Sequence, residues 1–192
     1  MFDKIKEEIN NCQKCDLYKS RNKAIVGNGN PNAEIFLIGE APGFEEDKKG
    51  IAFVGKSGQL LDKILAACNF DREKHIYIGN IIKCRPPQNR KPTKEEMEVC
   101  LPFLKRQIEM VDPKIIVLLG STAIKGLLDP YAKITRDRGN WKMYEKRFVM
   151  PTFHPSALLR NPALKKDVWE DFKKIIVKYR ELVDANHECK YI

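Results

Sequence analysis

The sequence lacks any apolar run approaching the roughly 20 residues that a membrane-spanning helix needs. Its first residues, MFDKIKEEINNC, also lack the apolar core of a signal peptide, so we expect a cytoplasmic protein with no membrane partner. Internal repeats and low-complexity segments are missing as well. The chain has 192 residues, 43% of them hydrophobic and 32% charged, which predicts a single globular domain over residues 1–192.

A phosphate-binding loop of the kind that holds nucleotides is not indicated either. The dinucleotide pattern G-x-G-x-x-G is absent. Gly55-Lys56-Ser57 resembles the end of a P-loop, with Gly50 five positions before Gly55, but no strand pattern precedes Gly50. A small nucleotide-binding α/β enzyme is therefore a poor alternative for this chain.

The chain is strongly basic, with 35 Lys and Arg against 26 Asp and Glu and a net charge of +9. Such an excess favours a polyanionic partner such as nucleic acid. A lysine-rich surface that is merely solvated would give the same composition. Charge alone therefore does not decide between these two interpretations.

Short β-rich segments alternate with longer segments of helical periodicity. The predicted strands are Ala33–Ile38, His75–Ile78, Lys114–Leu119 and Arg147–Thr152. The predicted helices are Ser57–Asn69, Thr93–Val111, Ser121–Leu128 and one over about 162–185, with Ser57 and Thr93 placed as N-caps. A hairpin is expected around Lys133–Tyr144. This alternation predicts an α/β fold, a three-layer αβα sandwich with a central, mostly parallel four-stranded sheet.

Unusual polar residues stand where the predicted strands end. Glu40 follows the first strand, Asn80 the second and His154 the fourth. In an open α/β sheet, ligands bind outside the carboxyl ends of the strands. These three residues, far apart in the sequence, are therefore expected to meet at one rim of the sheet.

Six cysteines in a chain expected to be cytoplasmic favour metal or redox chemistry over disulfides. Cys12 and Cys15 form a C-x-x-C pair, and Cys84 and Cys100 lie in further polar settings. Four thiolates suit a zinc ion or an iron–sulfur cluster, and the spacing does not choose between them. We exclude the remaining two from a metal site, one on an apolar helix face and one in a polar tail: Cys68 and Cys189.

Several short motifs match one known family, in the expected order along the chain. They are Cys12-Gln-Lys-Cys15, Gly39-Glu-Ala-Pro-Gly43, Ala52-Phe-Val-Gly55 followed by Ser57-Gly58, Asn80-Ile-Ile-Lys-Cys-Arg-Pro-Pro87, Cys100 and His154-Pro-Ser-Ala-Leu-Leu-Arg160. On these motifs the sequence resembles the family-4 uracil-DNA glycosylases, the thermostable iron–sulfur type. The resemblance implies a base excision repair enzyme that flips uracil out of DNA and hydrolyses its N-glycosidic bond. It would leave an abasic site, with no lyase step.

The resemblance also implies a 4Fe–4S cluster held by Cys12, Cys15, Cys84 and Cys100, which resolves the choice that the spacing leaves open. The cluster is expected to be structural and to lie near the DNA face. A related subgroup binds uracil covalently, using a basic insertion with a histidine ahead of the His-Pro-Ser motif. The corresponding Asp137-Arg-Gly-Asn-Trp141 contains no histidine, so we expect ordinary hydrolytic turnover.

The chemistry of uracil excision suits the family's site residues. The resemblance implies that Phe53 stacks on the flipped base. The Asn80 amide can pair with uracil O4 and N3–H, whereas cytosine would leave buried groups unpaired. His154, as a neutral imidazole, is expected to donate to O2 as negative charge develops there. Glu40 is expected to hold the water that attacks the sugar.

The rest of the site is expected around these residues. Gly39 and the loop after it should contact uracil, and Glu46 is the candidate for excluding the thymine methyl group. DNA contacts are expected from basic and small polar groups and from an apolar wedge. They are Lys56, Ser57, Lys83, Arg85, Arg90, Ser156 and Arg160, with Leu158 or Leu159 as the wedge.

The expected partner is uracil-containing DNA, single- or double-stranded, bound by a monomer. A sliding clamp is a candidate partner, although no docking motif stands out. An alternative from another class is a non-catalytic nucleic-acid-binding module held together by a metal. In that case the residues at the three strand ends would be incidental, and uracil would not be released.

Overall fold

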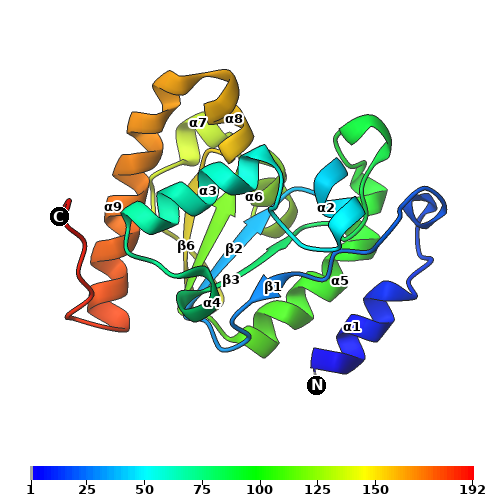
Figure 1. Cartoon of the computed structure of the whole chain (residues 1–192), viewed down its shortest axis with the longest axis horizontal. Helices are drawn as coiled ribbons and strands as arrows, with labels where there is room; N and C mark the ends of the chain where they lie inside the picture. Colours follow the sequence, from blue (N-terminus) through cyan, green and yellow to red (C-terminus); the bar gives the residue numbers. More distant parts are fainter. Residues whose placement is uncertain (1) are drawn as a thin grey trace.

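The computed structural model describes residues 2–192, which form three layers, with one mixed sheet between two layers of helices (Figure 1). The strand order is β1-β3-β2-β4-β6-β5. The four inner strands run parallel: β3 (Ile76–Asn80), β2 (Ile35–Gly39), β4 (Ile115–Leu119) and β6 (Arg147–Thr152). Two edge strands pair antiparallel with β3 and β6, respectively: β1 (Asn28–Gly29) and β5 (Lys142–Tyr144).

The α/β sandwich with a mostly parallel sheet is confirmed, but the predicted number of four strands is wrong. The four predicted strands are the inner ones, and the two edge strands were missed. These have two and three residues, too few to show the alternation by which a strand is recognised in a sequence. The hairpin expected around Lys133–Tyr144 lies further along the chain, where β5 pairs with β6 over residues 142–152, and Ile134–Asp137 within the expected range form a short helix.

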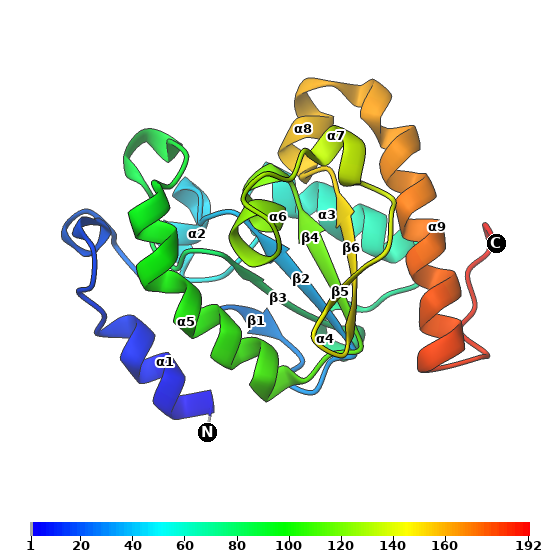
Figure 2. The ribbon, with the colours of Figure 1, turned by 180° about the vertical axis from the view of Figure 1, so that it is seen from behind.

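The inner strands are buried on both faces, which is why they form continuous apolar runs in the sequence. In β2, Ile35 and Leu37 face one helical layer, while Phe36 and Ile38 face the other. The first layer contains α3 (Lys56–Ala67) and α9 (Lys165–Leu182). The second contains α1 (Phe2–Asn10), α5 (Lys94–Val111) and α6 (Ser121–Leu127). Figure 2 shows the molecule from the side opposite to that of Figure 1.

The ends of the long helices test the capping predictions. Thr93 caps α5, because its hydroxyl accepts from the Glu96 N–H at 3.2 Å and the Glu96 carboxylate accepts from the Thr93 N–H at 2.8 Å. The N-cap predicted at Ser57 is wrong. Helix α3 begins at Lys56 after an extended Gly55, so Ser57 lies in its first turn. The helix predicted over 162–185 divides into a 3-10 turn, η3 (Pro162–Leu164), and α9.

Several short helices were not predicted. They are α1, η1 (Asp16–Lys19), α2 (Phe44–Lys49), α4 (Arg72–His75), η2 (Pro87–Asn89), α7 (Ile134–Asp137) and α8 (Pro155–Arg160). Apart from α1 they have at most six residues, fewer than two full turns, so they show no helical period. The helices α2, α6 and α8 follow β2, β4 and β6 at the edge of the sheet where the strands end (Figure 1).

Two cysteines are buried in the α3–α9 layer, remote in sequence from the C-x-x-C pair. Cys68 is fully buried at the end of α3, and burial raises its thiol pKa to about 12. Cys189, in the C-terminal tail, is also buried, and its thiol donates to the Ala67 carbonyl at 3.4 Å. Among residues 2–192, no helix is long and apolar enough to span a bilayer.

Candidate active site and cysteine-lined cavity

The ends of β2 and β3 bring two predicted uracil-binding residues together. Gly39 and Asn80 are register partners across these strands. A Cβ added to Gly39 would lie 2.5 Å from Asn80 Oδ1 and 2.5 Å from Phe53 Cζ. The amide and the ring therefore meet over Gly39, and only glycine leaves room for both.

The loop that carries Phe53 is held in a strained conformation. Phe53 has φ of 54°, in the left-handed region that costs a bulky residue free energy. The Arg72 guanidinium donates to the Phe53 carbonyl at 3.1 Å and also to the carbonyl of Ala52. A Cβ on Gly58 would lie 1.9 Å from the Phe53 carbonyl oxygen, so α3 also packs tightly against this peptide. These contacts hold the Phe53 backbone in this conformation.

The Glu46 carboxylate holds the same loop from the other side. Its oxygens accept from the N–H groups of Val54 and Gly55, each at 2.8 Å, and of Gly43 at 3.1 Å. Glu46 thus joins the loop after β2 to the loop of Phe53. The structure shows this anchoring role directly, whereas the exclusion of thymine by Glu46 remains a prediction.

Asn80 presents an unpaired polar atom. Its side chain is buried, and Oδ1 has no hydrogen-bond partner among the residues that the structure describes. A buried polar atom without a partner costs about 1–3 kcal/mol, so each one calls for an explanation, and a ligand that supplies the missing partner is one such explanation. Its own carbonyl accepts from Lys83 Nζ at 2.9 Å, which fixes the backbone behind the amide.

His154 caps α8, and its orientation is set by Ser156. The Ser156 N–H donates to His154 Nδ1 at 3.1 Å, and the Ser156 hydroxyl lies 2.8 Å from the same nitrogen. Because Nδ1 is the acceptor, the proton of the neutral ring resides on Nε2. The ring lies 5.7 Å from the Phe53 ring, between centroids. Ser156 was expected to contact DNA, but here it selects the tautomer of His154.

Burial keeps His154 uncharged. It lowers the pKa of the imidazole from 6.5 to about 4, with the positive charge of Arg160 acting in the same direction and Glu46 opposing it. We expect the NMR signals of the His154 ring to titrate with a midpoint at about pH 4 instead of pH 6.5. The imidazole of an unfolded chain is protonated at a higher pH than that of the folded chain. The free energy of unfolding therefore falls as the pH is lowered from 6.5 to about 4. A midpoint near 6.5 would contradict the assignment.

Glu40 lies at the same rim and is oriented by a residue that the sequence analysis missed. The Thr122 hydroxyl, in the first turn of α6, donates to Glu40 Oε2. The carboxylate is thereby held at the carboxyl end of β4, and among residues 2–192 no side chain hydrogen-bonds to its other oxygen. The third strand end, which lacked a predicted site residue, thus contributes through Thr122. A threonine just after a predicted strand is the signal that could have identified it.

Two predicted DNA contacts are contradicted by burial. Lys83 is buried, its ammonium donates to the Asn80 carbonyl, and burial lowers its pKa to about 8. Leu158 is only 2% exposed and packs in the α3–α9 core, because it lies on the inner face of α8. Leu159, on the outer face, is 47% exposed and is the leucine available as a wedge.

The other predicted DNA contacts have varied surroundings. Lys56 is exposed and Ser57 half-buried in the first turn of α3, and Arg160 is exposed at the end of α8. Arg85 is half-buried beside α2. Arg90 forms a bidentate pair with Glu96, at 2.6 and 2.8 Å, so its charge is already neutralised within the protein.

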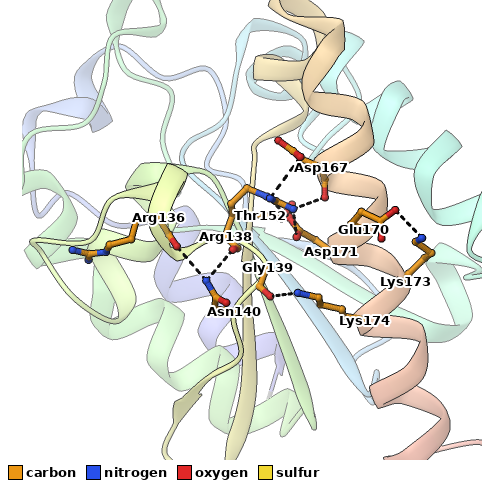
Figure 3. Close-up of polar contacts among 10 residues, drawn as sticks. All are labelled: Arg136, Arg138, Gly139, Asn140, Thr152, Asp167, Glu170, Asp171, Lys173 and Lys174. Atoms are coloured by element: carbon orange, nitrogen blue, oxygen red, sulfur yellow. Dashed lines mark hydrogen bonds and ion pairs between the residues drawn. The ribbon is translucent and has the colours of Figure 1, made fainter.

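A buried ion pair supports the strand that leads to His154 (Figure 3). Asp171 of α9 is fully buried and accepts from Arg138 Nε at 3.0 Å and from the Thr152 hydroxyl at 2.6 Å. Thr152 ends β6, two residues before His154. Lys174 of the same helix donates to the Gly139 carbonyl at 2.6 Å. These contacts fasten α9 and the loop before β5 to the end of β6.

Replacing Asp171 by alanine is expected to lower the free energy of unfolding by about 3–5 kcal/mol, because Arg138 and Thr152 would both lose the buried carboxylate to which they donate. The matched control is Glu170→Ala, since Glu170 makes an exposed pair with Lys173 at 2.7 Å. That change is expected to cost less than about 1 kcal/mol. Denaturant unfolding of both variants measures the difference, and equal losses would contradict a supporting role for Asp171.

Four cysteines surround one small cavity between the second helical layer and the loop after β3. Its lining includes Cys12, Cys15, Cys84 and Cys100 with the basic side chains of Arg21 and Lys83. Arg21 Nη1 donates to Cys84 Sγ at 3.0 Å. Burial raises the thiol pKa of Cys15, of Cys84 and, to about 11, of Cys100. The predicted set of four is thus brought together, while Cys68 and Cys189 lie elsewhere.

Known proteins match most of this chain in sequence. The sequence model of the uracil DNA glycosylase superfamily matches residues 26–173. A type-4 uracil-DNA glycosylase of Sulfurisphaera tokodaii is 45% identical over 182 residues, which cover 91% of this chain and 83% of that protein. One from Archaeoglobus fulgidus is 45% identical, covering 91% of each chain. One from Thermotoga maritima is 44% identical, covering 91% of this chain and 92% of that protein. The chain belongs to the type-4 uracil-DNA glycosylases of the uracil-DNA glycosylase superfamily.

Proposed function

We propose that this protein excises uracil from DNA by hydrolysing the N-glycosidic bond, leaving an abasic site for base excision repair. The observation that carries the proposal is the unpaired Asn80 Oδ1, buried at a rim shared with the Phe53 ring and a neutral His154. An amide acceptor, an aromatic face and an N–H donor are what a flipped uracil requires. All of them come from one chain and one domain, so a monomer is sufficient.

Recognition begins when the base leaves the helix and stacks on Phe53. Asn80 Oδ1 then accepts from uracil N3–H, and the amide NH₂ donates to O4. Cytosine presents an acceptor at N3 and a donor at N4, so both of its hydrogen bonds would be lost. Because the amide is buried, water does not replace them, and the discrimination is correspondingly large.

Bond cleavage separates charge between the sugar and the base. As the bond from C1′ to N1 breaks, its electron pair goes to uracil and the negative charge is shared with O2. His154 Nε2–H donates to O2, and its neutral state follows from burial and from Ser156. Water held by the Glu40 carboxylate then bonds to C1′ and passes a proton to that carboxylate, from which it is released to solvent, while uracil leaves as the anion. Thr122 holds the Glu40 carboxylate for this step.

Specificity against thymine depends on the loops that Glu46 ties together. The carboxylate accepts three backbone hydrogen bonds, which bring the loop after β2 against the loop of Phe53. We infer that Glu46 excludes the C5-methyl group by keeping these loops closed. DNA is positioned by Lys56, Ser57, Arg85 and Arg160, and Leu159 fills the space that the base vacates.

We infer that the four cysteines around the cavity hold a 4Fe–4S cluster, because four thiolates are the donor set that such a cluster takes. Among the described residues, no three Cys, His, Asp or Glu side chains converge closely enough to hold a single metal ion. The four thiols instead surround a cavity, and Arg21 and Lys83 offset their charge when they are deprotonated. When bound, the cluster would supply iron–thiolate bonds that cross-link residues before η1 to the β3 loop and α5.

The test of this function is uracil release from a synthetic strand. The purified protein is incubated with an oligonucleotide containing one uracil, without added divalent metal, and abasic sites are then cleaved with alkali. We expect a break at the uracil alone, and none in matched strands with cytosine or thymine at that position. Binding of the uracil strand without any break would favour the non-catalytic module instead.

A further inference from the structure

An exposed aromatic ring adjoins the uracil loop. Phe44 is the first residue of α2, directly after Gly43, and it is 53% exposed. It belongs to neither core cluster of the domain. The segment from Gly39 to Phe44 spans at most about 17 Å when extended. That is no more than about five nucleotide steps at 3.4 Å each, so the ring lies within a few nucleotides of a uracil bound at Gly39.

One face of this ring already carries a cation. The Arg85 guanidinium lies 5.1 Å from the centroid of Phe44. Such a contact is favourable because the negative face of the ring attracts the charge. The large exposure of Phe44 shows that much of the ring stays open to solvent. A planar group placed there would extend a stack that Arg85 begins.

Arg85 is held in place by a strained turn. Its Nε donates to Asn89 Oδ1 at 2.8 Å. Gln88 and Asn89 both have φ of 54°, two successive non-glycine residues in the left-handed region. Such conformations persist where the surrounding structure imposes them, and they concentrate at functional sites. The turn fixes the guanidinium over Phe44 and so prepares the stack.

We propose that Phe44 and Arg85 form a stacking platform for one unpaired base of single-stranded DNA next to the flipped uracil. Every base has a face that stacks on an aromatic ring, and the positive charge suits the neighbouring phosphate. In a duplex, the flanking bases stay stacked within the helix, so the platform acts on single strands. This inference rests on the proposed uracil excision and adds a substrate preference to it.

The experiment removes the stacked base from the DNA as well as the Phe44 ring from the protein. In a single strand with one uracil, each flanking nucleotide is replaced in turn by an abasic residue, and binding is measured by fluorescence anisotropy with wild-type protein and Phe44→Ala. At one position, wild-type protein should bind about tenfold more weakly, the effect of losing one stacked base. The Phe44→Ala variant should bind the intact strand more weakly than wild type does, and an abasic residue at that position should not weaken its binding further. On duplex DNA the two proteins should bind equally.

Controls separate the platform from general damage. Tyr191→Ala removes a ring of matched exposure, 52%, from the C-terminal tail on the far side of the molecule from α2, and it should behave as wild type (Figure 1). Phe44→Trp should retain binding, and its fluorescence should be quenched by a single strand. If an abasic residue weakens the binding of wild type and of Phe44→Ala equally at every flanking position, while both proteins release uracil, the platform is refuted. If wild type releases no uracil, the proposed function fails instead.

Discussion

Replacing His154 by alanine is expected to slow uracil release about 100- to 1,000-fold in single-turnover assays. This is the typical effect of removing one hydrogen-bond donor from a developing oxyanion. The ring is not part of the hydrophobic core, so the fold should persist. Affinity for an abasic-site strand should change little, because His154 acts on the leaving base. A variant with more than half of the wild-type rate would contradict the role of His154.

Ser156→Ala gives a graded control for the same site. It removes the hydroxyl beside Nδ1 but keeps the Ser156 N–H bond that sets the tautomer. Its effect on the rate should therefore be much smaller than that of His154→Ala. An equal loss in both variants would contradict this expectation, because it would show that the imidazole needs the Ser156 hydroxyl in order to act.

Replacing Cys84 by alanine is expected to abolish the brown colour of an iron–sulfur protein and most of the folded material. Cys84 joins the loop after β3 to the cavity, and Arg21 donates to its sulfur. Losing this ligand should release the segment that carries Cys12 and Cys15. Visible absorbance, iron content and thermal unfolding measure the outcome.

Cys189→Ala is the matched control, since Cys189 is also buried but lies outside the cavity. It should retain the full colour and lose about 1 kcal/mol of stability, as ordinary buried substitutions do. A colourless Cys189 variant, or a fully coloured and stable Cys84 variant, would show that the four ligands are wrongly assigned.

The sequence was sufficient to predict the residues at the strand ends. Apolar runs mark the parallel strands, ended by glycine in three of them and by the His-Pro pair in the fourth, and parallel strands end at one edge of the sheet. Asn80 and His154 are therefore located by pattern alone. Their chemistry required the family resemblance, because an asparagine after a strand is also an ordinary turn residue.

What the sequence could not predict depends on packing. Lys83 was expected at the surface because a lone lysine usually is, yet the cavity and the Asn80 carbonyl surround it. Leu158 and Leu159 are adjacent and alike, and only the phase of a six-residue helix decides which is buried. Arg72 and Thr122 act through single contacts across the fold, which leave no periodic signal in a sequence.

The short segment from Asn80 to Cys84 joins the residue proposed to pair with uracil to a ligand of the proposed cluster. Lys83 reinforces the connection, since it lines the cavity and donates to the Asn80 carbonyl. We therefore expect oxidative loss of the cluster to lower uracil release, because the backbone that carries the Asn80 amide would lose this support.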